Sequence, residues 1–198
     1  MKIYDISQEV FSCVVYPGDP TPKRNILKSM DDKEKYNLSK ISMCVHNGTH
    51  IDAPRHFIKD GKTVDKMPLN SFVGLAYVVE FNGKLTDKDA KNILNKASKV
   101  NKEAAKRILI KGDAEVTLEA AKVFAKAKIL LLGNESISVG PINSPMEVHV
   151  ELLKEDIVLL EGIRLNEVSE GIYLLNAAPL NLANTEGSPC RALLIENY

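Results

Sequence analysis

The chain has 198 residues, 44% of them hydrophobic, and its 26 basic and 26 acidic residues cancel to a net charge of zero. This length predicts one domain with a sizeable buried core. A chain with no net positive charge gives no electrostatic reason to bind nucleic acid or an anionic membrane, so we expect neither as a partner. Charged residues interrupt the N-terminal segment and every long apolar run, which argues against a signal peptide and a membrane span.

The three cysteines, Cys13, Cys44 and Cys190, are odd in number and widely spaced. This pattern fits a reducing compartment better than a disulfide framework, so we expect a cytoplasmic protein. Cys44 lies two residues before a histidine, but a small buried hydrophobic residue is a simpler interpretation than a thiolate ligand.

Short apolar runs rich in β-branched residues predict strands along the whole chain. In chain order, the predicted strands are Ile41–Val45, Ala76–Phe81, Arg107–Lys111, Lys128–Leu132, Ile157–Leu160 and Ala192–Ile195. Thr86 is a predicted cap for a helix to about Ala97, and Thr117 for a helix over Leu118–Ala127. Strands that alternate with helices predict an α/β fold with a mixed sheet. No repeat or linker divides the chain, so residues 1–198 are expected to form a single domain.

Three of the four histidines lie in one short segment, His46–Phe57, with the sequence HNGTHIDAPRHF. Imidazoles and a carboxylate this close together are typical ligands of a borderline divalent cation, which makes His46, His50 and Asp52 candidate ligands and His56 a nearby fourth group. Glycine and proline within the segment argue against a continuous helix. We therefore expect these side chains at the end of the strand that precedes them and in the following loop.

Two residues further along the chain have the same chemistry. His149 is the remaining histidine, and Glu161 ends the apolar strand predicted over Ile157–Leu160. A carboxylate at the end of a buried strand is costly unless it is paired, hydrogen-bonded or bound to metal. Taken alone, each of the two is explained more simply as a structural residue.

The segment His46–Phe57 carries the signature His-x-Gly-Thr-His-x-Asp-x-Pro-x-His-Phe without a departure, and it thereby resembles the metal-dependent cyclase/kynurenine formamidase family. The similarity extends to Tyr16–Asp19, Glu135–Pro141, Ser144–His149, Leu160–Gly162 and Gly187–Ala192. It thus covers essentially the whole chain. The resemblance implies a swivelling β/β/α domain, with a mixed, barrel-like sheet flanked by helices, and a homo-oligomer, either a dimer or a tetramer.

The family pattern also implies two metal sites that share two carboxylates. It assigns His46, His50, Asp52 and Glu161 to one metal, and Asp52, His149 and Glu161 to the other. The donor set suits two Zn²⁺ ions, with Mn²⁺ as an alternative. The implied reaction is hydrolysis of a small aryl formamide such as N-formylkynurenine. Water activated by the metals attacks the carbonyl, and His56 serves as the acid/base that protonates the leaving amine.

Two departures from the family bear on the substrate. Kynurenine formamidases commonly have a tryptophan where this chain has Tyr16, which is expected either to contact the substrate or to be a surface turn residue. The segment Lys111–Val116 is shorter than the loop that covers the site in many relatives, and it predicts a more open pocket. Two other functions stay open. The same site could hydrolyse a cyclic amide, imide or lactone such as an isatin-like ring, or the chain could bind a small molecule without turnover. Retention of His56 disfavours the last of these, since binding alone needs no proton shuttle.

Overall fold

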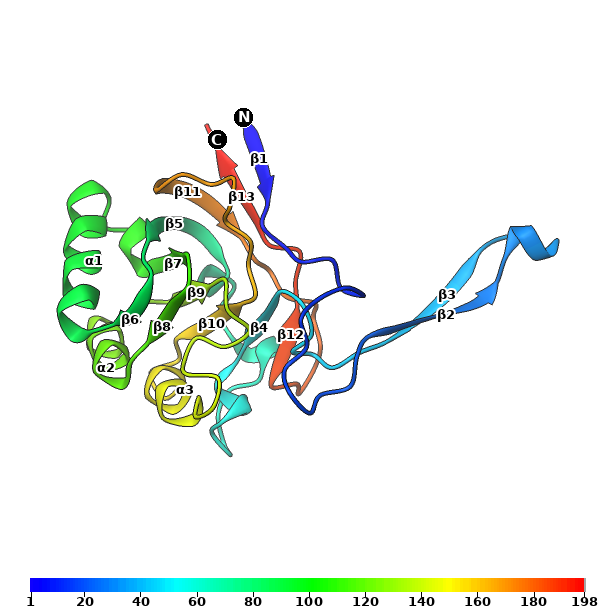
Figure 1. The fold of residues 1–198 in the computed structure, drawn as a ribbon, viewed down its shortest axis with the longest axis horizontal. Helices are drawn as coiled ribbons and strands as arrows, with labels where there is room; N and C mark the ends of the chain where they lie inside the picture. The colour runs from blue at the N-terminus through cyan, green and yellow to red at the C-terminus, as the bar shows by residue number, and fades with distance from the viewer. Residues whose placement is uncertain (198) are drawn as a thin grey trace.

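A computed structural model describes residues 1–197 and shows a curled, nine-stranded mixed sheet with three helices (Figure 1). In spatial order the strands are β1 (Lys2–Asp5), β13 (Leu193–Glu196), β11 (Gly171–Asn176), β5 (Val73–Glu80), β7 (Arg107–Lys111), β9 (Leu131–Asn134), β10 (Val158–Glu161), β4 (His50–Asp52) and β12 (Gly187–Pro189). The first and last strands of the chain pair with each other, so the two ends of the chain lie side by side.

The middle of the sheet is parallel and buried on both faces. β5, β7, β9 and β10 run parallel to one another, and β4 lies antiparallel beside β10. Such strands need apolar residues at consecutive positions rather than at alternate ones. Val158, Leu159 and Leu160 of β10 are accordingly all fully buried.

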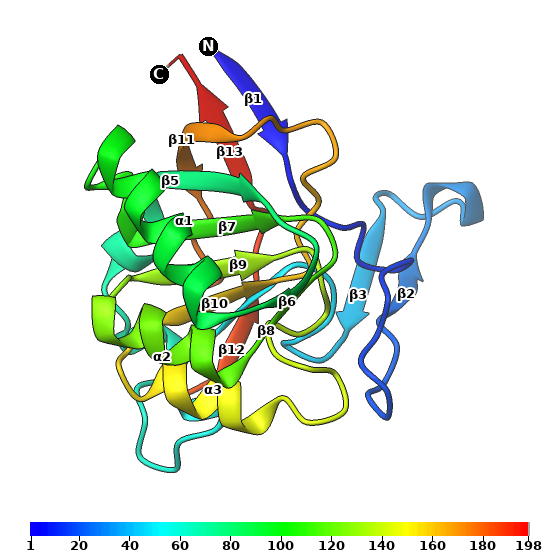
Figure 2. The ribbon, with the colours of Figure 1, turned by 60° about the vertical axis from the view of Figure 1, so that its left-hand side comes forward.

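The helices α1 (Asp87–Val100), α2 (Leu118–Ala127) and α3 (Met146–Leu153) cover one face of the sheet (Figure 2). Thr86 and Thr117 cap α1 and α2 by accepting hydrogen bonds from backbone N–H groups of the first turn. Two short strands, β6 (Gly83–Leu85) and β8 (Ala114–Val116), pair in parallel. Along the chain, β6 comes directly before α1 and β8 directly before α2. The opposite face of the sheet curls around a second apolar core.

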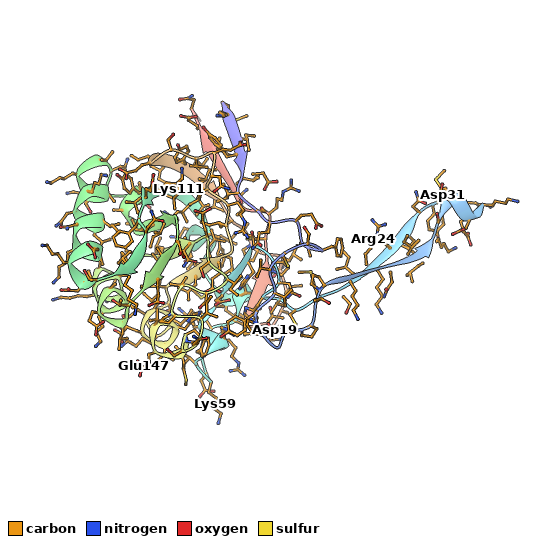
Figure 3. The ribbon with its side chains drawn as sticks, viewed as in Figure 1. Asp19, Arg24, Asp31, Lys59, Lys111 and Glu147 are labelled. Atoms are coloured by element: carbon orange, nitrogen blue, oxygen red, sulfur yellow. The ribbon has the colours of Figure 1, made fainter. Side chains whose placement is uncertain are left out.

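A two-stranded arm projects from the body (Figure 1). It consists of β2 (Lys23–Lys28) and β3 (Leu38–Ser42), joined through a 3₁₀ turn at Met30–Asp32. Arg24 lies along the arm and Asp31 near its tip, far from Lys111 on the body (Figure 3).

The predicted α/β class with a mixed sheet and flanking helices is confirmed. The strand Arg107–Lys111 and the helix Leu118–Ala127 have the predicted bounds, and α1 extends three residues beyond the predicted Ala97. The predicted strands near residues 76, 157 and 192 overlap β5, β10 and β13 with shifted ends.

Two predicted strands need correction. The strand predicted over Ile41–Val45 is wrong beyond Ser42, because the Cys44 backbone N–H donates to Asn47 Oδ1 and the Asn47 N–H donates to the Cys44 carbonyl, which makes a turn. The strand predicted from Lys128 starts only at Leu131, because Lys128 adopts the left-handed conformation that ends α2.

Within residues 1–197, no helix combines the length and the apolar character that crossing a membrane requires. Cys13, Cys44 and Cys190 are free thiols. The cytoplasmic location stays a prediction.

Candidate metal centre

Neighbouring strands place three of the candidate ligands on one face of the sheet. Glu161 at the end of β10 lies directly opposite His50 at the start of β4. Asp52 lies two residues after His50 and therefore points to the same side. His149 reaches the same point from α3, and His46 reaches it from the loop before β4.

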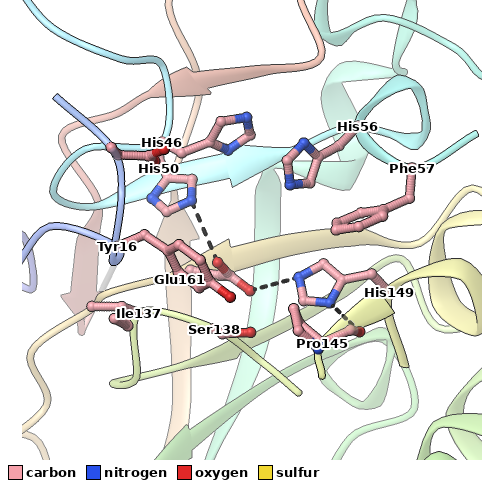
Figure 4. Close-up of a pocket in the computed structure, with 11 residues that line it drawn as sticks. Tyr16, His46, His50, His56, Phe57, Ile137, Ser138, Pro145, His149 and Glu161 are labelled. Carbon is pink, nitrogen blue, oxygen red and sulfur yellow. Dashed lines mark hydrogen bonds and ion pairs between the residues drawn. The ribbon is translucent and has the colours of Figure 1, made fainter. Parts of the chain in front are cut away.

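Each of the three imidazoles lies close to at least one of the two carboxylates, and Figure 4 shows four of the five side chains, all but Asp52. Nδ1 of His46 lies 2.8 Å from Oδ1 of Asp52, and Nε2 of His50 lies 3.4 Å from both Asp52 Oδ1 and Glu161 Oε2. Nε2 of His149 lies 3.1 Å from Glu161 Oε1 and 3.6 Å from Asp52 Oδ2. The donor atoms form two groups, His46/His50/Asp52 and Asp52/His149/Glu161, and within each group all atoms lie within 4.8 Å of one another.

The chemistry of these donors fits a divalent cation. Asp52 and Glu161 are both buried, and among residues 1–197 no lysine or arginine forms an ion pair with either of them. Asp52 Oδ2 and His46 Nε2 are buried without a hydrogen-bond partner. Two buried carboxylates and unpartnered ligand atoms leave polar groups unsatisfied, and a bound cation would satisfy them.

Backbone carbonyl groups orient two of the imidazoles. Nδ1 of His50 lies 3.0 Å from the Gly48 carbonyl oxygen, and Nδ1 of His149 lies 2.9 Å from that of Pro145. When each Nδ1–H donates to its carbonyl, the Nε2 atom that faces the carboxylates is the one left to bind a metal. This is the usual arrangement around histidine ligands, in which the outer hydrogen bond fixes the ring.

The electrostatics of the cluster agree with a cation site. Burial lowers the pKa of His50 and of His149, but the hydrogen bonds and charges of Asp52 and Glu161 outweigh it and raise the two pKa values to about 10 and about 9. Burial raises the pKa of Asp52, but the hydrogen bonds of His46 and His50 outweigh it and hold that pKa well below its usual value. The carboxylates thus attract a positive charge, which protons supply when no metal is bound.

His56 lies beside the cluster in a 3₁₀ turn, Pro54–His56, that follows β4. Its ring centroid is 4.1 Å from that of His46 and 6.2 Å from that of His149 (Figure 4). Burial lowers the pKa of His56; the charge of Asp52 opposes this shift and that of His46 adds to it. His56 is therefore a neutral imidazole at pH 7, able to accept a proton.

The cluster, apart from Asp52, forms the floor of a cavity of about 250 Å³. Besides the histidines and Glu161, the cavity is lined by Tyr16, Asp19, Phe57, Ile137, Ser138 and Pro145. Ser138 is only 3% exposed, and its Oγ has no hydrogen-bond partner. The Tyr16 hydroxyl donates a 2.7 Å hydrogen bond to the Ile142 carbonyl oxygen, which links two loops around the cavity.

The structure brings together all five predicted ligands and His56; their roles as ligands and as acid/base stay predictions. The placement differs from expectation in one respect, because His50 and Asp52 lie on a strand of their own rather than after the strand predicted from Ile41. Tyr16 lines the cavity, so it is more than a surface turn residue, and its contact with substrate stays a prediction.

Sequence reasoning missed two cavity residues, Asp19 and Ser138, although both lie in segments that share the family resemblance. The more open pocket expected from the short segment Lys111–Val116 stays a prediction. Within the described part of the chain that segment does not line the cavity, since its end forms β8 and pairs with β6.

Comparison with known proteins extends these observations. The family model described as "Putative cyclase" matches residues 4–141. The chain belongs to the cyclase/kynurenine formamidase family. Members of this family that the chain resembles include the kynurenine formamidase of Salinibacter ruber, 33% identical over 98% of this chain and 97% of that protein, and that of Erythrobacter litoralis, 31% identical over 98% and 94%.

Solved structures from the family have the same fold. A structure described as a potential metal-dependent hydrolase with cyclase activity superposes with a TM-score of 0.79 at 28% identity, covering 98% of this chain and 96% of that one. Isatin hydrolase A from Labrenzia aggregata superposes with a TM-score of 0.80 at 22% identity, covering 98% and 93%, and at that identity it supports the fold alone.

Proposed function

We propose that the chain is a metal-dependent amidohydrolase that cleaves the C–N bond of a small aryl formamide such as N-formylkynurenine. The observation that carries this proposal is the convergence of three imidazoles and two buried carboxylates beside His56, all of which except Asp52 line one cavity. Kynurenine formamidases that are about 30% identical over nearly the whole chain support the substrate class.

The five ligands would hold two divalent cations, Zn²⁺ or Mn²⁺, with Asp52 and Glu161 shared between them. Bound there, such cations supply Lewis acidity and lower the pKa of water toward neutrality. His56 is neutral at pH 7 and faces the same cavity, so it accepts the proton of the attacking water. It then returns this proton to the leaving nitrogen, which would otherwise depart as an unstable anion. The products are formate and an aryl amine.

The cavity suits a small aromatic substrate. Its volume is about 250 Å³, and Tyr16, Phe57 and Ile137 give it an apolar wall above the polar floor. The unpartnered Oγ of Ser138, buried beside Glu161, is free to hydrogen-bond the amide group of the substrate.

Asp19 adds a reason to favour an amino-acid-like formamide. Its carboxylate is exposed and lines the cavity, where it would attract the ammonium group of N-formylkynurenine. The simpler compound formanilide has no such group. We therefore expect Asp19→Asn to raise KM for N-formylkynurenine while leaving KM for formanilide unchanged.

Turnover of N-formylkynurenine, formanilide and isatin by the metal-loaded enzyme tests the proposal. For Asp19→Asn the matched control is Glu147→Gln, because it removes an exposed carboxylate of α3 outside the cavity (Figure 3). Hydrolysis of isatin without hydrolysis of either formamide would show that the substrates are cyclic amides and not aryl formamides. Binding of all three compounds without hydrolysis would make the chain a binding protein.

A further inference from the structure

Asn134 is a buried polar residue at the end of an apolar strand. It follows Leu131, Leu132 and Gly133 in β9, and its side chain has no exposed surface. Its Nδ2 donates a 3.2 Å hydrogen bond to the Ser138 carbonyl oxygen, whereas its Oδ1 has no hydrogen-bond partner within residues 1–197. A buried amide that uses only part of its hydrogen-bonding capacity costs stability relative to an apolar side chain of the same size. Asn134 is therefore a candidate for a role other than packing.

The neighbouring carbonyl group fixes which way the Asn134 amide points. A carbonyl oxygen can only accept a hydrogen bond, so the end of the amide that lies against Ser138 is its NH₂ group. Asn134 thus reaches forward over the segment that follows β9 and holds one backbone carbonyl of that segment. Ser138 itself lines the cavity of the candidate metal centre, beside Glu161 (Figure 4).

The Ser138 carbonyl belongs to the same peptide group as the Val139 N–H. That N–H donates a 2.6 Å hydrogen bond to Oε1 of Glu161, the carboxylate proposed to be shared by two cations. A peptide group is planar and rigid, and in the trans form found here its C=O and N–H point in opposite directions. Asn134 and Glu161 therefore hold opposite ends of one rigid unit.

The bond from Val139 determines how the Glu161 carboxylate is turned. Oε1, which accepts this bond, also lies 3.1 Å from Nε2 of His149, and Oε2 lies 3.4 Å from Nε2 of His50. Each carboxylate oxygen thus faces a different histidine. Rotation of the carboxylate would break the bond from Val139 and move both oxygens away from these positions.

Other hydrogen bonds attach the same segment to the end of β10 and beyond, but none of them holds the Ser138 carbonyl. The Ser136 carbonyl oxygen accepts from the Gly162 N–H at 2.8 Å, and the Asn134 carbonyl oxygen accepts from the Ile163 N–H at 3.2 Å. Ser136 Oγ accepts from the Ser138 N–H at 3.3 Å, and this N–H belongs to the preceding peptide group. In the described part of the chain, the Asn134 side chain alone donates to the Ser138 carbonyl oxygen.

We propose that Asn134 is a positioning residue for Glu161 and acts on it through the Ser138–Val139 peptide group. Nδ2 holds the carbonyl end of this group, and the N–H end holds Glu161 Oε1 in the orientation that a shared metal ligand needs. Hydrogen bonds in a chain also polarise one another, so the bond from Asn134 makes the Val139 N–H a stronger donor. The role in metal binding rests on the proposed function, whereas the chain of hydrogen bonds does not depend on it.

Zn²⁺ affinity, measured by competition with a chelator, tests the proposal without a substrate. Asn134→Leu removes the donor at nearly constant volume, and we expect it to bind Zn²⁺ about 10-fold more weakly, as on loss of a group that orients a metal ligand. Asn134→Thr should show the same loss, because its hydroxyl lies one bond nearer to the backbone than Nδ2 and falls short of the carbonyl. It serves as the second variant if Asn134→Leu does not fold.

Ser136→Ala is the matched control for both variants. It removes a side-chain hydrogen bond to the backbone of the same segment, but that bond holds a different peptide group. We therefore expect wild-type Zn²⁺ affinity in Ser136→Ala. Wild-type affinity in a folded Asn134 variant, or an equal loss in Ser136→Ala, would overturn the proposal.

The NMR resonance of the Val139 amide proton reports on the peptide group in metal-free protein. An N–H that donates to a carboxylate makes a short, strong hydrogen bond, and its proton resonates downfield. We expect this position in the wild type and in Ser136→Ala, and an upfield shift in the Asn134 variants. An unchanged Val139 resonance in those variants would overturn the proposal. Wild type that binds no metal would count against the proposed function, and the Val139 resonance would still decide whether Asn134 orients this peptide group.

Discussion

Thr49 Oγ1 donates a 2.7 Å hydrogen bond to the carbonyl oxygen of Gly162, and it thereby ties the residue before His50 to the residue after Glu161. The same hydroxyl accepts a 2.9 Å hydrogen bond from the Gln8 backbone N–H. The backbones that carry two candidate ligands on different strands are thus tied together by one buried side chain, whose hydrogen bonds go to the backbone of Gly162 and of Gln8.

Thr49→Val removes both hydrogen bonds at nearly constant volume. We expect metal affinity to fall by about 10–100-fold, the usual effect of losing a group that orients ligands, as measured by competition with a chelator. Thr117→Val is the matched control, because its hydroxyl also donates to a carbonyl, that of Leu85, and accepts from a backbone N–H, that of Ala120. Both variants should be less stable. Equal metal affinity in the two would remove Thr49 from the metal centre.

Gly187→Ala should displace His46. A Cβ atom at Gly187 would lie 2.7 Å from His46 Cε1 and 2.8 Å from the Ile51 carbonyl oxygen, closer than real Cβ atoms approach. We expect lower metal occupancy by elemental analysis. Gly112→Ala, between β7 and β8, is the control, since its Cβ would lie 2.6 Å from both Asn82 Oδ1 and the Phe81 carbonyl oxygen and should cost stability while leaving occupancy unchanged. Full occupancy in Gly187→Ala would contradict a ligand role for His46.

His56→Ala should keep its metal and lose most of its activity. Positioned acid/base groups contribute roughly 10²–10⁴-fold to turnover, and His56 lies beside the cluster without being one of the ligands. Because burial lowers the pKa of His56 below 6.5, wild-type activity should persist at pH 6.5 and fall at lower pH, where His56 becomes protonated. Metal content and the pH profile check both points. Wild-type turnover in the variant would exclude His56 from the reaction.

Metal-free protein should lose stability as the pH rises. Folding raises the pKa of His50 to about 10 and of His149 to about 9, above their ordinary value of 6.5. The stabilisation from these two protonated imidazoles is therefore complete below pH 6.5 and is lost as the pH rises through 9 and 10. Urea unfolding of metal-stripped protein at pH 6.5 and pH 10 measures it, with His149→Gln as a variant that should show a smaller difference. An equal or higher free energy of unfolding at pH 10 would be incompatible with the charges assigned here.

Local signals in the sequence were sufficient for the elements that flank the site. Thr117 and the apolar spacing after it predicted α2 to the residue, because capping and helical periodicity act over a few positions. The error at Ile41–Val45 arose where Asn47 folds its side chain back onto Cys44, an interaction that alternating hydrophobicity does not reveal. Apart from Ile41 and Ser42, which fall in the strand predicted over Ile41–Val45, the arm was not predicted. Every position of its strands except Lys28 is exposed, so they have no buried face to give the sequence an alternating apolar pattern.

The convergence of the site could be predicted only in part. The spacing of residues from His46 to Asp52 was enough to predict metal ligands there. His149 on a helix and Glu161 on a strand each lie more than 90 residues further along, so spacing could not connect them with this segment. Only the pairing of β4 with β10 brings Glu161 opposite His50, and pairing between distant strands is not encoded in local periodicity. Ser138 was missed because a lone serine in a turn carries no distinguishing pattern.

The metal content of purified protein, measured together with N-formylkynurenine hydrolysis after stripping and titration back, tests the central claim most directly. We predict that activity disappears on removal of metal and returns in proportion to added Zn²⁺ or Mn²⁺ up to two ions per chain, and that Glu161→Ala neither retains metal nor recovers activity. Full activity in metal-stripped wild type, or full metal occupancy in Glu161→Ala, would contradict the account.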